Sequence, residues 1–302
     1  MLVSLFGNLA VIAIVKKNKR MWTTTNFLIA NMAASDLLIS TFAVPRELAE
    51  TFTGPHRWLL DGVPGLALCK LVYFFQDIST AVSIQSLVVM AIDRYRGVVF
   101  PFRPPIITPK VCRMIVPIIW IVAMTIHGTY FYTARLVMQD DKKSYCKFSW
   151  APKFDERRTQ KSYFIFISVF LIFIPLCVIF TLYALILIEL NKQKVTENGA
   201  SAIRRQRQKE DTAIVKKILI IVFLFVFCIT PITVSSLLYY FAWDWHLPCG
   251  MDKLFSAAKF IFYSNASLTP CIYVILSERY QQGLKDLANC SFSKQENTND
   301  IN

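Results

Sequence analysis

Charged residues are scarce in this chain. Asp, Glu, Lys and Arg together make up 18% of its 302 residues, whereas an ordinary globular domain has about 25%. The length alone would allow about two soluble domains, but hydrophobic residues account for 55% of the chain. That proportion excludes a disordered chain. Histidine is rarer still, and the three histidines lie in different segments, at His56, His127 and His246. They form no catalytic cluster in the sequence, so we do not expect an enzyme.

Long apolar runs make up most of the sequence. Runs of 18 or more residues with almost no charge indicate transmembrane helices, because only internal hydrogen bonds satisfy the backbone in lipid. Seven runs are visible: Met1–Val15, Met21–Val44, Leu71–Ile92, Met114–Ala134, Ser162–Ile188, Ile218–Trp243 and Phe260–Ser277. The sequence therefore predicts an all-α membrane protein, a bundle of seven transmembrane helices.

The first run is short for a membrane span. Its 15 residues would rise only about 23 Å, against a hydrocarbon core of ~30 Å. It lacks the basic leader and the small-residue cleavage site of a signal peptide. We therefore expect a first helix without its outer turns, in a chain whose natural N-terminus lies farther upstream.

Basic residues are distributed unevenly between the loops. The loops after the first, third and fifth runs, together with the tail, hold 20 of the 33 Lys and Arg residues, and the other side holds 13. This bias predicts a cytoplasmic C-terminus, and an odd number of spans then places the N-terminus outside the cell. The net charge of +13 is explained by such loops, and we expect a lipid bilayer rather than nucleic acid as the partner.

The segment after the last run has the pattern of an amphipathic helix. Within Ser277–Ala288, apolar side chains recur at spacings of three and four, which predicts a short eighth helix lying along the membrane. Cys290 follows it and is either a palmitoylation site or a free cytoplasmic thiol. We expect one membrane domain over residues 1–290 and a disordered tail over residues 291–302.

Asp36 is a carboxylate near the middle of the second run. A charged group at this depth is costly and marks a function by default. Ser83 and Asn265 also lie inside spans and could supply further oxygens. Such a set of oxygen ligands suits a small hard cation such as sodium, so we expect an allosteric sodium ion and no other cofactor. The alternative is a protonated Asp36 that is hydrogen-bonded inside the bundle.

The triplet Asp93-Arg94-Tyr95 ends the third run at its cytoplasmic boundary. Arg94 can pair with Asp93, and Asp211, at the cytoplasmic start of the sixth span, is an available second partner. An ion pair between helices that must break is suited to a two-state switch.

Two cysteines face the outer compartment. Cys69 begins the third span and Cys146 lies in the long loop before the fifth, so we expect them to form a disulfide in an oxidising environment. Proline residues interrupt three later runs, and each should kink its helix. They are Pro175, Pro231 and Pro270.

Taken together and in order, these motifs resemble the rhodopsin-like (class A) G-protein-coupled receptors over nearly the whole chain. The matching residues are Gly7-Asn8-Leu9-Ala10-Val11, Asn31 with Ser35-Asp36-Leu37, Cys69, Asp93-Arg94-Tyr95 with Pro101, Trp120, Pro175 with Tyr183, Phe225 with Cys228 and Pro231, and Pro270 with Tyr273. The resemblance implies seven antiparallel helices, a short eighth one, and coupling to heterotrimeric G proteins. It also implies that Arg94 and Tyr183 engage the G protein, and that a core relay is formed by Ile84, Pro175 and Phe225.

Two positions depart from the family pattern. Ile229 stands where the family usually has a tryptophan before the helix-six proline, so the large aromatic toggle is absent. Thr269 replaces the asparagine before Pro270, although its hydroxyl can still offer an oxygen near Asp36. Both changes weaken any transfer of the family's activation details to this chain.

The expected ligand is an extracellular neuropeptide. Gln76 occupies the position of the amine receptors' aspartate, and Tyr263 that of the opsins' lysine, which argues against a monoamine and against retinal. The outer loop Leu136–Phe148 predicts a β-hairpin lid, a feature of peptide receptors. Gln76 and the run Arg20–Leu28 also resemble neuropeptide receptors of the neuropeptide FF, orexin and neuropeptide Y kind. A class A receptor for a small non-peptide ligand is the alternative, and a transporter is a more distant one, because no repeated halves are visible.

Charged and aromatic side chains near the outer helix ends are candidates for the ligand site. Charges at membrane depth usually line a water-filled cavity or pair with each other. Gln76 offers a donor and an acceptor, which suits a peptide's terminal amide. The other candidates are Arg46, Glu47, Asp77, Lys259, and, as apolar walls, Phe74, Phe75, Phe164, Tyr239, Phe255 and Tyr263. The alternative is an internal Asp77–Lys259 or Glu47–Lys259 pair with no ligand role.

Overall fold

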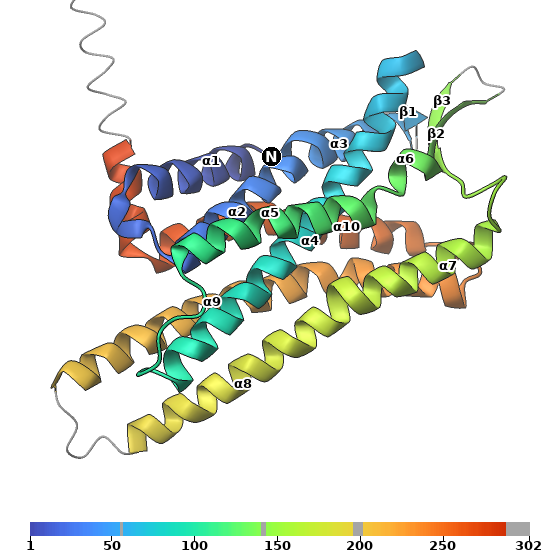
Figure 1. The fold of residues 1–302 in the computed structure, drawn as a ribbon. Helices are drawn as coiled ribbons and strands as arrows, with labels where there is room; N and C mark the ends of the chain where they lie inside the picture. The colour runs from blue at the N-terminus through green and yellow to red at the C-terminus, as the bar shows by residue number, and fades with distance from the viewer. Residues whose placement is uncertain (55–56, 140–142, 196–201, 288–302) are drawn as a thin grey trace, which may run out of the picture.

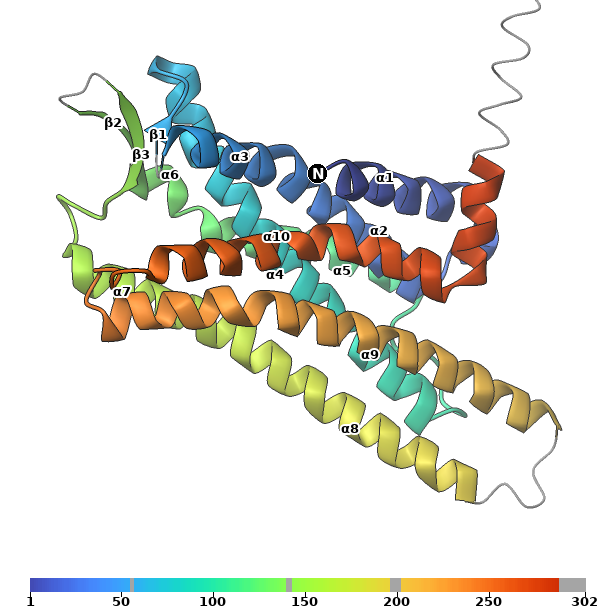
Figure 2. The ribbon, with the colours of Figure 1, turned by 180° about the vertical axis from the view of Figure 1, so that it is seen from behind.

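The computed structural model describes the chain except for residues 55–56, 140–142, 196–201 and 288–302. The described part is a bundle of long helices with a small sheet at one end (Figures 1 and 2). The elements are α1 (Leu2–Lys17), η1 (Lys19–Met21), α2 (Thr24–Leu38), η2 (Ile39–Ala43), α3 (Val44–Thr53), β1 (Arg57–Trp58), α4 (Gly62–Val99), α5 (Pro109–His127), α6 (Tyr130–Thr133), β2 (Ala134–Met138), β3 (Ser144–Phe148), α7 (Glu156–Ile167), η3 (Ser168–Phe173), α8 (Ile174–Val195), α9 (Ala202–Leu237), η4 (Leu238–Ala242) and α10 (Met251–Leu276).

Each predicted apolar run corresponds to one helical rod of the bundle. Five rods in the described part are long and apolar enough to cross a membrane: 24–53, 62–99, 109–133, 156–193 and 208–242. A sixth is reached when α10 is counted together with the helix Glu278–Leu287, which is bent from it by 102°. The remaining rod, α1, has 16 residues, which agrees with the short first helix expected from the sequence.

Several helices extend beyond their apolar runs. The backbone of α4 begins at Gly62 rather than Leu71, and α10 begins at Met251 rather than Phe260. The second rod continues through Pro45 to Thr53, because a π-helical turn precedes the proline and Pro45 lies in the first turn of α3, where no intrahelical N–H bond is needed. Hydropathy follows the lipid layer, whereas helical hydrogen bonding continues into the polar layers on either side.

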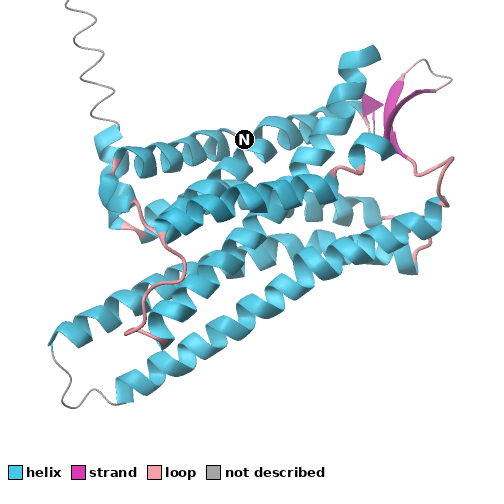
Figure 3. Ribbon diagram, in the orientation of Figure 1, coloured by secondary structure: helices cyan, strands magenta, loops and turns pink. Residues whose placement is uncertain are grey.

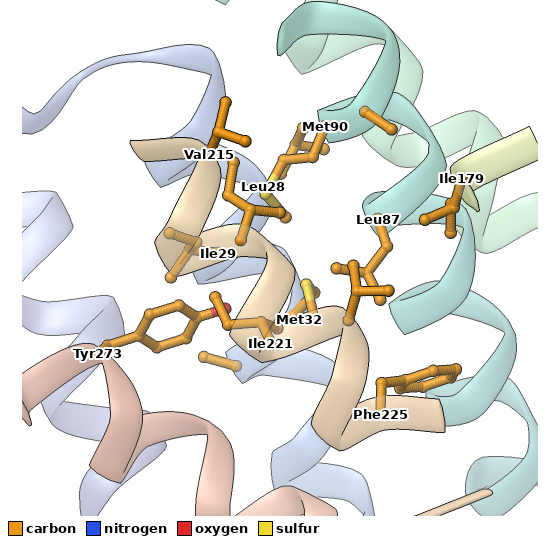
Figure 4. Close-up of a cluster of buried hydrophobic side chains, with 14 of the residues drawn as sticks. Leu28, Ile29, Met32, Leu87, Met90, Ile179, Val215, Ile221, Phe225 and Tyr273 are labelled. Atoms are coloured by element: carbon orange, nitrogen blue, oxygen red, sulfur yellow. The ribbon is translucent and has the colours of Figure 1, made fainter. Parts of the chain in front are cut away.

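The hydrophobic core is centred on α4. This helix crosses the bundle obliquely and packs against α2, α5, α8 and α9 (Figures 1 and 2). Figure 4 shows the inner part of the core, where side chains from different rods meet. The buried residues labelled there are Leu28, Ile29, Met32, Leu87, Met90, Ile179, Val215, Ile221, Phe225 and Tyr273. Contacts between buried side chains of different helices therefore fix how each helix is rotated about its own axis.

Two glycines mark close helix contacts. A Cβ atom at Gly7 of α1 would lie 2.8 Å from Cγ of Pro270 in α10. A Cβ atom at Gly283 would lie 2.5 Å from Cγ2 of Ile14. Only a residue without a side chain allows these approaches, so α1 is held by α10 and by the helix Glu278–Leu287. The predicted amphipathic eighth helix is thereby confirmed; Cys290 lies outside the described residues.

A three-stranded antiparallel sheet lies at the opposite end from the helix Glu278–Leu287 (Figure 3). Its strand order is β1-β3-β2, with Leu136 opposite Cys146. The predicted hairpin is therefore confirmed in β2 and β3. The third strand, Arg57–Trp58, was not predicted, because a two-residue strand has no detectable alternation.

Candidate functional site

Four charged side chains meet at the sheet end of α3 and α10. Nζ of Lys259 lies 3.1 Å from Oε1 of Glu47 and 3.7 Å from Oε2 of Glu50. The guanidinium of Arg46 contacts both carboxylates, at 3.3 Å to Glu47, and lies over the ring of Tyr73 at 4.4 Å. The structure therefore contains the Glu47–Lys259 pair that was one alternative. Glu50 was missed, although it lies four residues after Arg46, the usual spacing for helical ion pairs.

Gln76 connects this charged group to α10. Its Oε1 accepts a hydrogen bond of 2.7 Å from the hydroxyl of Tyr263, and Tyr263 also lies 3.4 Å from Oε1 of Glu47. The two positions that argued against an amine and against retinal are thus in direct contact. We refer to Arg46, Glu47, Glu50, Gln76, Asp77, Lys259 and Tyr263 as the outer cluster.

Asp77, the next residue of α4, contacts the end of α5 and the turn α6. Its Oδ2 accepts a hydrogen bond of 2.5 Å from the hydroxyl of Tyr130, and Nδ1 of His127 lies 3.8 Å away. Nε2 of Gln76 lies 3.5 Å from Oδ1. Tyr130 and His127 were not predicted as partners of Asp77, because the end of α5 and the turn α6 contribute them from elsewhere in the chain.

The predicted aromatic walls divide into two groups. Phe164 packs against Tyr240 with ring centroids 5.0 Å apart, and Tyr239 packs against Tyr240 at 5.2 Å. Phe255 instead lies 5.9 Å from the ammonium of Lys259. Phe164 and Tyr239 thus belong to a contact between α7 and η4, whereas Phe255 belongs to α10. The predicted aromatic residues therefore lie on different sides of the outer end of the bundle.

The sheet is attached to this end of the bundle by the expected disulfide. Cys69 in α4 and Cys146 in β3 are bonded, with a Cα–Cα distance of 5.7 Å. Both half-cystines are buried, together with Tyr73 and Ala134. Ser144 adds a hydrogen bond to the side chain of Asp61. The lid is therefore fixed to the top of α4, beside Gln76 and Asp77.

A small cavity of about 20 Å³ surrounds Asp36 in the middle of the bundle. It is lined by Ser79, Ser83 and Asn265, together with Phe225 and Ile229. Asp36 is 2% exposed, and among the described contacts its Oδ2 has no hydrogen-bond partner. A buried carboxylate oxygen without a donor is the arrangement that a cation completes. The space suffices for about one water-sized guest, so these residues fit a sodium ion. Ser79 was missed, although it lies one helical turn from Ser83.

The third-helix triplet lies at the far end of the bundle. Nε of Arg94 lies 3.2 Å from Oδ2 of Asp93, and a second guanidinium nitrogen contacts the same oxygen. The ring of Tyr95 packs edge-on against Phe100, with centroids 5.9 Å apart. The structure contains the predicted Asp93–Arg94 pair, and the contact between Arg94 and Asp211 stays a prediction.

Tyr183, which the resemblance implies in coupling, and Tyr273, which follows Pro270 in the family's helix-seven motif, are both buried. Tyr183 of α8 lies within electrostatic range of Arg94, and its hydroxyl has no hydrogen-bond partner among the described residues. Tyr273 of α10 stacks on Tyr280 at 5.7 Å, and its hydroxyl is likewise without a partner in the described part. Buried hydroxyls that lack a hydrogen-bond partner are costly to the fold, and the role of both tyrosines in switching stays a prediction.

The structure buries all three residues of the predicted core relay, Ile84, Pro175 and Phe225, and their action as a relay stays a prediction. Ile84 is 0% exposed and Phe225 is 4% exposed, and both belong to the central core. Pro175 lies in the first turn of α8, two residues after the end of the π-helical segment η3, and Pro231 lies inside α9. The unusual Ile229 is itself buried in this core, so the position keeps a packing role without an aromatic ring.

The fold and these sites define a multi-pass membrane receptor. Residues 7–273 match the 7 transmembrane receptor (rhodopsin family), and the chain belongs to that family. This membership confirms the predicted seven-helix fold, and since the family is one of receptors it also confirms that the chain is not an enzyme.

Known relatives cover nearly the whole chain. The substance-P receptor of Rattus norvegicus is 27% identical over 290 residues, which is 95% of this chain and 68% of the relative. Neuropeptide FF receptor 2 of Rattus norvegicus is 29% identical over 301 residues, covering 93% and 68%. The QRFP-like peptide receptor of Branchiostoma floridae is 29% identical over 307 residues, covering 97% and 76%. All three are peptide receptors by name.

Proposed function

We propose that this chain is a plasma-membrane receptor for an extracellular neuropeptide, an amidated one, and that it transmits the signal to heterotrimeric G proteins. The observation that carries the proposal is the disulfide-anchored sheet directly beside the outer cluster. Edge strands and loop surfaces of this kind offer backbone groups to an extended peptide. The names of the relatives support the same ligand class.

The orientation follows from this role. The sheet and the outer cluster face the extracellular side, and the triplet at Arg94 faces the cytoplasm, where a G protein docks. The uneven distribution of Lys and Arg between the loops supports this orientation. Gln76, with an amide that donates and accepts, suits a terminal amide of the peptide.

Asp36, Ser83 and Asn265 would hold a sodium ion in the resting state. The bound cation would neutralise a carboxylate that otherwise has no partner, and it would stabilise the conformation in which the cavity is closed. A peptide that favours the other conformation would then be opposed by sodium.

The experiment is a screen of amidated neuropeptides against cells that express the chain. We expect a peptide-evoked second-messenger response that cells without the receptor do not give. Transport of the same peptides across the membrane, measured in parallel with labelled peptide, should be absent. Flux without a second-messenger response would contradict the proposal and would favour a transporter.

A further inference from the structure

The charges of the outer cluster balance each other, with one exception. Arg46 and Lys259 face Glu47 and Glu50 in a mutually paired set of two cations and two anions. The fifth charged group, Asp77, lies outside this set. Within the described part of the chain, no Lys or Arg nitrogen lies within 4.0 Å of its carboxylate.

The contacts of Asp77 leave it able to bind something else. Its bonds come from the hydroxyl of Tyr130 at 2.5 Å and the amide of Gln76 at 3.5 Å, both of which are neutral donors. Nδ1 of His127 lies 3.8 Å away without a hydrogen-bond partner in the described residues, and the imidazole side chain is 3% exposed. The side chain of Asp77 keeps 26% of its surface exposed. A charged carboxylate at this depth normally has a cation as its partner.

Further tyrosines, contributed by other helices, lie near this carboxylate. The hydroxyls of Tyr163, Tyr240 and Tyr263 lie within electrostatic range of Asp77. Each of them already has a hydrogen-bond partner, from Thr129, Gln160 and Gln76 respectively. These bonds hold the three side chains, contributed by α7, η4 and α10, in place near the carboxylate. A carboxylate among aromatic rings is the chemistry that recognises guanidinium and ammonium groups.

We infer that Asp77, with Tyr130 bonded to it and further tyrosines nearby, forms a subsite for a cationic group of the ligand, a guanidinium or an ammonium. This inference rests on the proposed peptide-receptor function and narrows the ligand class to peptides that carry a basic group. It gives adjacent residues of α4 different roles: Gln76 binds the neutral terminal amide of the peptide, and Asp77 binds its cationic group. The subsite lies one position after the residue at which amine receptors place their carboxylate.

The test uses two probes of nearly equal size, of which one carries a guanidinium and the other a neutral urea. N-acetyl-argininamide and N-acetyl-citrullinamide have nearly the same shape, but only the first is cationic. Their affinities are measured by saturation-transfer NMR on the purified full chain in lipid nanodiscs at constant sodium. We expect argininamide to bind roughly tenfold more tightly, the lower end of what hydrogen bonds to a charged group contribute. Asp77→Asn should remove this preference while citrullinamide binding is kept, and Asp77→Glu should retain it.

Two further variants test the inference even if the Asp77 variants fail to fold. Tyr163→Leu leaves the carboxylate in place and removes one ring, so the preference should fall about two- to fivefold. Asp252→Asn removes an exposed carboxylate of α10 that has no role in the subsite, and it should leave the preference unchanged. The inference is overturned if the parent chain binds both probes equally, if the preference survives Asp77→Asn, or if it disappears in Asp252→Asn. Activation of the receptor by peptides without any basic group would overturn the subsite but not the peptide-receptor proposal. If argininamide is preferred in an Asp77-dependent way but no peptide activates the receptor, the subsite stands and the peptide-receptor proposal is contradicted.

Discussion

Lys259 of α10 and Glu47 of α3 form an ion pair with 3.1 Å between Nζ and Oε1. The pair links two helices more than 200 positions apart in sequence, and it lies at the end of the bundle that carries the sheet. Because Glu50 shares the same lysine at 3.7 Å, the link holds the outer end of α3 against α10 in the structure.

Replacing Lys259 tests how much this link stabilises the resting receptor. Lys259→Ala leaves two partly buried carboxylates with Arg46 as their remaining cation, and we expect a loss of about 1–3 kcal/mol of stability. The measurement is the apparent unfolding temperature of the purified receptor without ligand. Lys253→Ala, at an exposed position of the same helix, is the matched control and should be neutral. Equal unfolding temperatures for the two variants would show that the pair contributes nothing.

Gly7 tests the packing of α1 independently of any ligand. Gly7→Ala places a methyl group 2.8 Å from the ring of Pro270, so α1 must shift, and overpacking of this kind costs about 1–3 kcal/mol. Gly97→Ala is the control, because nothing lies within 4 Å of the place its methyl group would take and alanine favours a helix. We expect a lower unfolding temperature for the first and an equal or higher one for the second. A stable Gly7→Ala variant would mean that the two helices are not in close contact.

Sodium should oppose agonist binding if it occupies the cavity at Asp36. Coupling between two such sites is typically about 1–3 kcal/mol, so replacing sodium by a large organic cation should raise agonist affinity roughly five- to a hundredfold. Asp36→Asn should abolish the difference, and Ser79→Ala should reduce it. Radioligand binding with the first active peptide measures it. An intact receptor with the same agonist affinity in both salts would refute the ion site.

Gln76 should distinguish an amidated peptide from its free acid. Removing one partner of a buried hydrogen bond costs about 1–3 kcal/mol, so Gln76→Ala should reduce the potency of the amidated form about five- to a hundredfold and that of the acid by less. Gln85→Ala, on the same helix farther from the sheet, is the control. If Gln76→Ala leaves the potency of every active peptide unchanged, the terminal amide is recognised elsewhere, and the sheet becomes the first candidate.

The helices of the bundle could be predicted because each one that crosses the lipid needs a long run of apolar residues. The disulfide and the hairpin were predictable because both depend on local pattern and on the side of the membrane. The partners of Asp77 were not, since Tyr130 and His127 approach only through the relative rotation of α4 and α5. Ser79 and Glu50 could have been found by helical spacing alone, from Ser83 and Arg46.

The boundaries of the rods show a different limit. Hydropathy ended the second rod at Val44, yet the helix continues to Thr53 and carries Arg46 and Glu47. Charged residues past an apolar run lower the hydropathy signal, although their backbone remains helical. The charged residues of this extension belong to the outer cluster, and the sequence pattern placed them just past the end of a helix.

The central claim is that a peptide bound at the outer cluster activates a G protein through Arg94. The most direct measurement is peptide-stimulated guanine-nucleotide exchange on purified heterotrimeric G protein, with the receptor in nanodiscs and with peptide affinity measured on the same preparation. Arg94 pairs with Asp93 in the structure and lies far from the outer cluster, so Arg94→Ala should lose stimulated exchange while it keeps peptide affinity within about threefold, a difference of less than 1 kcal/mol. Exchange that the peptide stimulates equally in the parent and in Arg94→Ala, or an absence of stimulation in the parent with every peptide that binds, would contradict the account.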